Sequence, residues 1–181
     1  MKHTNRTQSL LVGLISIAYA LSVPQVASAD EQIVPLAASG TWVAAAHKPN
    51  LVSPPDVCLA MNPQTGFTFR ADRDSVEVRV VNSAWSLPSD VQGTITVTVP
   101  GWHATFDITS NTSDMVSATI EQADLLPMFA AMDKAAAMTV AVGKAPPLTI
   151  SLAGSTRVTD AFRTCAGINS NSKTPGGNPF Q

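Results

Sequence analysis

Alternating hydrophobic and polar residues in the middle of the chain predict four strands. Val, Ile and Thr dominate these stretches, and a period of two places the apolar side chains on one face. Turn-forming residues separate the stretches, which favours antiparallel neighbours with one buried face. The four predicted strands span residues 75–80, 94–99, 102–108 and 116–120.

Weaker patterns predict strands on both sides of this central group. The first is expected at residues 41–47, and the link at 82–93 between two of the central strands is unusually long. We expect residues 30–40 to be a flexible leader and residues 168–181, rich in Asn, Ser, Gly and Pro, to be a disordered tail. The remaining predicted strands are 57–61, 67–69, 138–142 and 148–152.

A change to helical periodicity predicts one helix at residues 124–137. Its apolar residues recur at i, i+3, i+4 and i+7, from Leu125 to Met132. Pro127 is compatible with a helix only in the first turn, so the helix should begin at about residues 123–126.

A second short helix is predicted near the end of the chain. Ser155 is suited to cap its first turn, and Gly167 suits the left-handed position just past its end. Its buried face would carry four apolar residues at helical spacing: Val158, Ala161, Phe162 and Cys165. Together with the strands, these helices predict one α+β domain at residues 41–167. We expect a mostly antiparallel β-sandwich or barrel of about eight strands with two short helices.

The first 29 residues have the features of an export signal. Lys2 and Arg6 precede an apolar segment, and a small-x-small motif ends at Ala29. We therefore predict cleavage after Ala29, a periplasmic or secreted mature protein, and no stable membrane insertion after cleavage. The apolar segment is short for a membrane span and is interrupted by Gly13 and two serines.

Two cysteines remain in the predicted mature chain, Cys58 and Cys165. An even number of cysteines in an exported protein favours a disulfide, so we predict a bond between them. Their wide separation does not match the spacing of a metal site or of a redox CxxC pair.

The charge pattern argues against a nucleic-acid partner. The whole chain has 11 basic and 13 acidic residues, and removal of Lys2 and Arg6 would make the mature chain more acidic. The sequence contains no basic stripe of the kind that contacts phosphates. Charged residues make up only 13% of the chain, so Ser, Thr and Asn must supply much of the polar surface.

No motif in the sequence indicates catalysis. His103 and Asp107 would lie on the solvent face of one strand, too far apart for a hydrogen bond, and His47 has no obvious orienting partner. There is no nucleophile elbow and no glycine-rich phosphate loop. We therefore expect no catalytic residues, no cofactor and no metal. Absence of a motif still leaves open a hydrolase site assembled from distant residues.

The long link at 82–93 is the best candidate for a binding surface. It carries Trp85 and Leu87, two apolar side chains that are costly to expose without a use. The alternative is that Trp85 closes the open end of the β core, whereas Trp102 follows the core phase of its strand.

The order of these elements resembles a known group of exported proteins. The segments CLAMNPQTG and NSAWSLP are followed by a helix, a strand and SLAGSTRVTDAFRTC. This order is similar to that of exported proteobacterial proteins of the invasion-associated locus B kind, over most of residues 42–165. The resemblance implies an envelope location and a β-rich fold, and it implies no catalytic residues.

The sequence thus favours a noncatalytic envelope protein that binds an unknown envelope protein or a small ligand through Trp85 and Leu87. The alternatives are a hydrolase with a scattered site and an accessory subunit of an envelope or secretion assembly.

Overall fold

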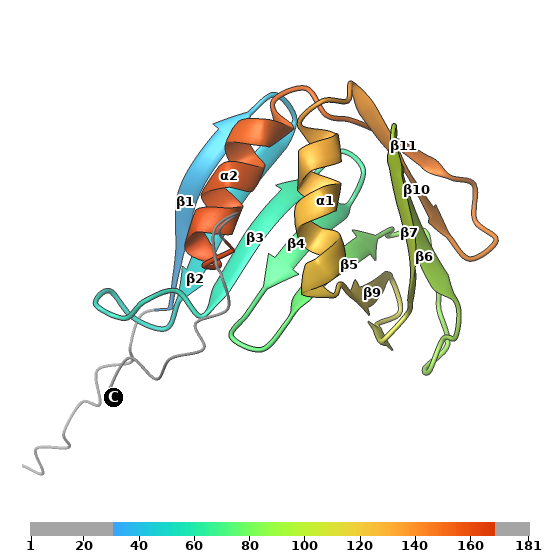
Figure 1. Ribbon diagram of the computed structural model, residues 1–181. Helices are drawn as coiled ribbons and strands as arrows, with labels where there is room; N and C mark the ends of the chain where they lie inside the picture. The colour runs from blue at the N-terminus through green and yellow to red at the C-terminus, as the bar shows by residue number, and fades with distance from the viewer. Residues whose placement is uncertain (1–30, 169–181) are drawn as a thin grey trace, which may run out of the picture.

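A computed structural model describes residues 31–168 of the chain. These residues form two antiparallel sheets and two helices, an α+β sandwich-like fold without a closed barrel. In Figure 1 both helices lie in front of the larger sheet, and the two sheets splay apart at one end. The predicted export signal at residues 1–29 and residues 169–181 of the predicted tail lie outside the described residues.

The larger sheet has seven strands in the order β1-β2-β3-β4-β5-β9-β8. The neighbours from β1 to β5 are consecutive in the chain, and each pairs antiparallel to the next. Its strands are β1 (Gln32–Ser39), β2 (Trp42–Lys48), β3 (Val57–Asn62), β4 (Phe67–Ala71), β5 (Val76–Val81), β8 (Ser110–Asn111) and β9 (Met115–Thr119).

The smaller sheet has four strands in the order β11-β10-β6-β7, which are β6 (Thr94–Val99), β7 (Trp102–Asp107), β10 (Ala137–Val142) and β11 (Leu148–Ser151). The helices are α1 (Gln122–Met132) and α2 (Ser155–Cys165). Within residues 31–168 the chain crosses between the sheets three times: through the link at 82–93, again after β7, and through α1 between β9 and β10. No helix within residues 31–168 is long and apolar enough to cross a membrane.

Five aromatic side chains form the centre of the core. Phe69 is fully buried and packs edge-on against Phe67 at 4.9 Å and Phe129 at 5.2 Å between ring centroids. Trp42 contacts Phe67, and Phe162 of α2 contacts both Phe69 and Phe129. The larger sheet and both helices therefore share one aromatic cluster.

A single hydrogen bond also connects the two sheets across the core. The indole Nε1 of Trp42 on β2 donates to the carbonyl oxygen of Ser151 on β11, at 2.8 Å. Trp42 is fully buried, so this bond satisfies the polar atom of a large core side chain.

The predicted disulfide between Cys58 and Cys165 is present. It joins β3 to the last residue of α2, with 6.0 Å between the two Cα atoms. Helix α2 also packs on β1, β2 and β3 through its buried face. The disulfide therefore adds a covalent link to a helix that hydrophobic packing already holds on the sheet.

Three expectations about the elements were wrong. Residues 32–39 of the predicted leader form β1, which pairs with β2 over its whole length. Only one edge of β1 is paired and its apolar residues do not alternate cleanly, so the periodicity did not reveal the strand. Ile168, expected in the tail, packs against the core, and helix α1 ends at Met132, before the expected residue 137. The predicted antiparallel α+β sandwich with two short helices is confirmed, with eleven strands in residues 31–168.

Both helices begin one or more residues away from the expected positions. Helix α1 starts at Gln122 and ends at Met132, so Pro127 is its sixth residue and lies beyond the first turn. Pro127 is on the exposed side of α1, where water can bond the carbonyl that loses its partner. Ser155 is the first residue of α2, whereas Gly154 occupies the cap position and no side chain caps the helix.

Gly154 is required by a close contact between two turns. It has a φ of 85°, and a Cβ built on it would lie 2.6 Å from the carbonyl oxygen of Ser39. Across the same contact, a Cβ on Gly40 would lie 2.5 Å from the carbonyl oxygen of Ala153. The β1–β2 turn and the β11–α2 turn thus approach each other at two glycines.

Replacing Gly154 by Ala should destabilise the fold by about 2 to 3 kcal/mol. The new methyl group meets backbone atoms that cannot swing aside, and the left-handed conformation adds strain. Urea unfolding of the purified variant measures this loss. The matched control is Gly101→Ala, which has a similar φ of 85° but has nothing within 4 Å of the added Cβ. Equal losses for the two variants would contradict the close contact.

Candidate functional site

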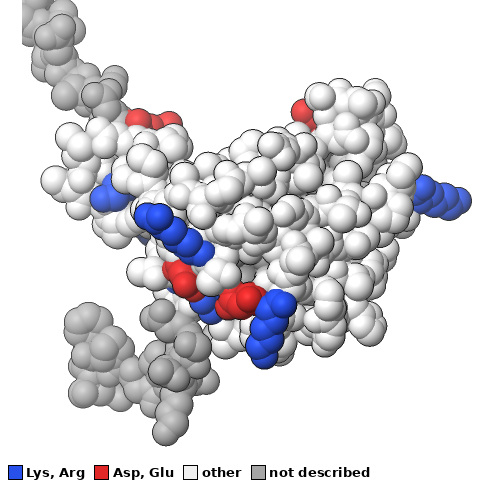
Figure 2. Space-filling model, turned by 90° about the horizontal axis from the view of Figure 1, so that it is seen from above, with Lys and Arg blue, Asp and Glu red and all other residues white. Residues whose placement is uncertain are grey.

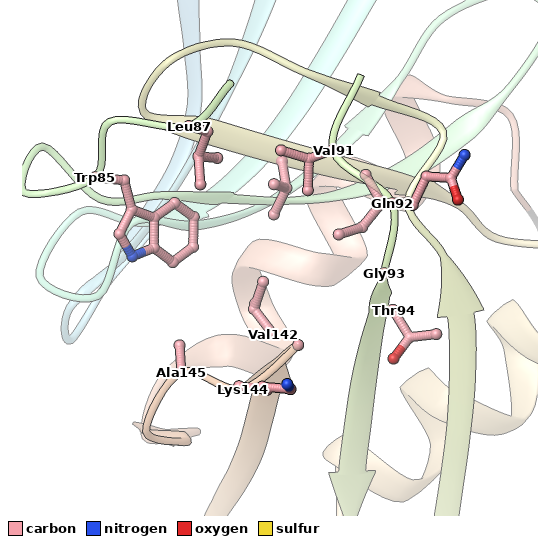
Figure 3. Close-up of a pocket in the computed structure, with 12 residues that line it drawn as sticks. Trp85, Leu87, Val91, Gln92, Gly93, Thr94, Val142, Lys144 and Ala145 are labelled. Carbon is pink, nitrogen blue, oxygen red and sulfur yellow. The ribbon is translucent and has the colours of Figure 1, made fainter. Parts of the chain in front are cut away.

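A pocket of about 510 Å³ lies at the open end of the sandwich, where both sheets contribute side chains. This volume is typical of small-molecule sites. Figure 3 shows Trp85, Leu87 and Val91 on one side and Val142, Lys144 and Ala145 on the other. Seven of the twelve lining residues are hydrophobic: Trp85, Leu87, Val91, Ile108, Val116, Val142 and Ala145.

One wall of the pocket is the link at 82–93, and hydrogen bonds hold its backbone. The amide of Asn82 donates to the carbonyl of Asp114, and the amide of Leu87 donates to the carbonyl of Ser113, both at 2.8 Å. Asn111 clamps the next part, because its Nδ2 donates to the carbonyl of Pro88 and its Oδ1 accepts from the amide of Val91. The long link is therefore an ordered wall tied to the strands beside it.

The opposite wall is the turn between β10 and β11. The amide of Ala145 donates to the carbonyl of Val142, and the amide of Gly143 donates to the carbonyl of Thr94 on β6. Gly143 has a φ of 49°, which allows the tight turn. These bonds place Lys144 at the tip of the turn and Val142 at its base.

The structure brings the two predicted binding residues, Trp85 and Leu87, into this one pocket. Both side chains are half-buried and pack against the core, so Trp85 also covers part of the core's open end. Trp85 was predicted either to bind a ligand or to close the open end of the core. The structure allows both, because its side chain lines the pocket and also packs against the core.

Sequence reasoning missed the residues on the opposite wall. Val142 and Lys144 come from a turn that β-sheet pairing carries to the link, since Val142 pairs with Ile95 on β6. Ile108 and Val116 likewise reach the pocket only after the chain crosses between the sheets. Their alternation predicts strands, but no local signal identifies their partners.

His47 has an orienting partner after all. Its Nδ1 lies 2.6 Å from a carboxylate oxygen of Asp56, and its Nε2 lies 3.8 Å from a carboxylate oxygen of Glu31. No local sequence pattern indicates this pair, because the turn-rich segment between β2 and β3 folds back to place Asp56 beside His47. In a hydrolase triad, a nucleophile would occupy the position at Nε2 that faces Glu31. The pair therefore fixes the base of the β2–β3 loop and does not form a triad.

The His47–Asp56 pair should make stability depend on pH. The hydrogen bond to Asp56, followed by the charges of Asp56 and Glu31, raises the pKa of His47 above its ordinary value. Stabilisation by protonated His47 is therefore complete below about pH 6.5 and is lost as the pH rises through the raised pKa. The melting temperatures of wild type and His47→Gln should converge as the pH increases from about 6 to about 8. A difference that stays constant or grows would contradict the ion pair.

His103→Gln is the matched control for this measurement. As predicted, His103 and Asp107 are exposed on the outer face of β7. No group of three or more His, Cys, Asp or Glu side chains in residues 31–168 is arranged to hold a metal ion.

Comparisons with protein-family models, curated proteins and solved structures found no significant match to this chain.

Proposed function

We propose that this protein is a noncatalytic envelope protein that binds a partner or ligand in the pocket at the open end of its sandwich. The observation that carries the proposal is the pocket itself, which has an ordinary ligand-site volume and mainly hydrophobic walls. One wall is the link at 82–93, the other is the turn between β10 and β11, and each is held by backbone hydrogen bonds. A preformed site of this kind binds without the cost of ordering a loop.

The chemistry of the lining supports binding over catalysis. Lys144 is the one residue with an ionisable side chain among the twelve that line the pocket. In many acid–base and nucleophilic sites, a second group at hydrogen-bonding distance activates the reacting one, and no second ionisable group lines this pocket. The pocket offers apolar contact, one cation and a few polar groups, which suit recognition.

The compartment is part of the proposal. The Cys58–Cys165 disulfide is compatible with an oxidising compartment, and the first 29 residues have the features of a cleavable export signal. These two observations together support a periplasmic or secreted location. Figure 2 shows that the face seen from above is mostly neutral, with acidic and basic side chains mixed, which supports a partner other than nucleic acid.

Replacing Trp85 by Ala should weaken binding at least tenfold while the protein stays folded. Trp85 is the largest side chain that lines the pocket, and such aromatic anchors commonly contribute 2 kcal/mol or more, roughly thirtyfold, to binding. The experiment compares wild-type and Trp85→Ala protein as immobilised baits in periplasmic extract and identifies the captured proteins and small molecules by mass spectrometry. Circular dichroism verifies that the variant is folded.

Trp102→Ala is the matched control. Trp102 is also a half-buried tryptophan that packs against the core, but it pairs with Val99 at the opposite end of β6 from Thr94. The Trp102→Ala variant should capture the same material as wild-type protein. If Trp85→Ala also captures the same material, the pocket is not the binding site; if it unfolds, Trp85 serves the core alone.

The accessory-subunit alternative has one supporting observation. Ile33 on β1 is 65% exposed, and Val52 in the β2–β3 loop is 94% exposed. Stable co-purification with an envelope assembly that depends on these residues and not on Trp85 would favour that alternative.

A further inference from the structure

We infer that the pocket binds a small organic anion with an apolar body, of the medium-chain carboxylate class. This inference rests on the proposed function and specifies the ligand of that same pocket. Two features point to it, the apolar interior and the single cation at the rim.

The apolar interior of the pocket favours a ligand whose main part is an apolar chain or ring. Trp85, Leu87 and Val91 face Val142 and Ala145 across the pocket, so a slender apolar chain or ring between them would contact both walls (Figure 3). Each buried methylene of such a chain contributes roughly 0.8 kcal/mol. A fully polar ligand, such as a sugar or an amino acid, would leave these walls without partners and would lose its own hydration.

The positive charge of Lys144 favours a negatively charged ligand. It carries the only formal charge among the lining residues, and no acidic side chain lines the pocket. None of the ion pairs among residues 31–168 involves Lys144, so its ammonium group has no carboxylate partner within the described part of the protein. Thr94, whose carbonyl accepts from the amide of Gly143, also lines the pocket and adds a hydroxyl donor that suits an oxyanion.

The position of Lys144 favours an amphipathic ligand over a simple ion. Lys144 is exposed at the tip of the β10–β11 turn, whereas Val116 at the base of the pocket is fully buried. A ligand with its apolar end inside and its anionic head at the rim would satisfy both regions. The backbone hydrogen bonds of Gly143 and Ala145 hold the turn, so the backbone that carries Lys144 is in place before binding.

The test compares three probes, each with a ten-carbon chain, on the full mature protein. Decanoate, decanol and decyltrimethylammonium are titrated by calorimetry below their micelle concentrations or solubility limits, at low and at high salt. We expect decanoate to bind roughly two- to fivefold more tightly than decanol, because Lys144 is exposed and exposed ion pairs are weak. The cation should bind most weakly, and the advantage of decanoate should shrink at high salt.

Substitution of the lysine separates the charge from the apolar contact. In Lys144→Gln, decanoate and decanol should bind equally, while the affinity for decanol stays at its wild-type value. Lys134→Gln is the matched control, since Lys134 is an exposed lysine beyond the end of α1 and does not line the pocket. It should keep the wild-type preference.

The outcomes distinguish the two proposals. If none of the probes binds, the ligand class is wrong, and the capture experiment with Trp85→Ala still decides the pocket's function. If the probes bind Trp85→Ala as they bind wild type, they do not occupy the pocket, and both proposals are wrong. If decanol and decanoate bind equally to wild type, or if Lys144→Gln keeps the preference, the apolar pocket stands and the anionic ligand is wrong. Preferential binding of the cation would also overturn the ligand class.

Discussion

Removing the disulfide by replacing Cys58 and Cys165 with Ala is expected to lower the free energy of unfolding by about 4 to 5 kcal/mol, as an upper value. The bond joins residues 107 positions apart, so it closes a long loop in the unfolded chain and removes much of its conformational entropy. Residual structure in the unfolded chain would reduce the effect. For a domain of ordinary stability this is a large share of the total.

Urea unfolding of the oxidised wild type and of the double variant measures the effect. Wild type with a reducing agent should match the double variant, and the reducing agent should not affect the double variant further. Helix α2 should stay packed on the larger sheet in the double variant, because Val158 and Phe162 are buried in the core. Equal unfolding midpoints for the oxidised and reduced wild type would show that the bond contributes nothing.

Replacing Phe69 by Ala is the second large effect, with an expected loss of about 3 to 5 kcal/mol. Phe69 is fully buried on β4, and its ring contacts Phe67, Phe129 and Phe162. The substitution therefore opens a cavity where the larger sheet meets both helices. Close packing around the site leaves little freedom for the neighbours to fill it.

Phe69→Leu is the control for this substitution, because it keeps most of the volume and should cost less than the alanine variant. Denaturant unfolding of both proteins, with wild type beside them, gives the comparison. A loss below about 1 kcal/mol for Phe69→Ala would contradict the central place of this ring in the core.

The strands with one covered face were predictable from the sequence. In β5 and β6, the residues Val78, Val80, Ile95, Val97 and Val99 are buried, and polar neighbours alternate with them. Burial of one face imposes the period of two that the sequence displays. The Cys58–Cys165 bond followed from two cysteines in a chain with a predicted export signal.

The elements that were mispredicted lie where local preference and long-range pairing disagree. Residues 133–137 are rich in helix formers, yet α1 ends at Met132, and Ala137 begins β10, which pairs with β6 and β11. Strand β1 lies at an edge, and Pro35 is tolerated there because only one side of the strand is paired.

One of the two walls of the candidate site, the link at 82–93, was predictable from the sequence. Trp85 and Leu87 stood out as apolar residues in a long link, which is a local feature. Val142 and Lys144 complete the pocket only because β10 pairs with β6, and the alternation of a strand does not name its neighbour. The His47–Asp56 pair was not predictable either, because it forms only when the segment between β2 and β3 folds back.

The central claim is that the pocket at the open end of the sandwich is the ligand site. A titration of isotope-labelled mature protein with decanoate, followed by amide chemical shifts in NMR, tests it most directly. The account predicts shifts concentrated at residues 85–94 and 142–145, the two walls of the pocket. Shifts centred instead on the exposed β2–β3 loop near Val52 would contradict it.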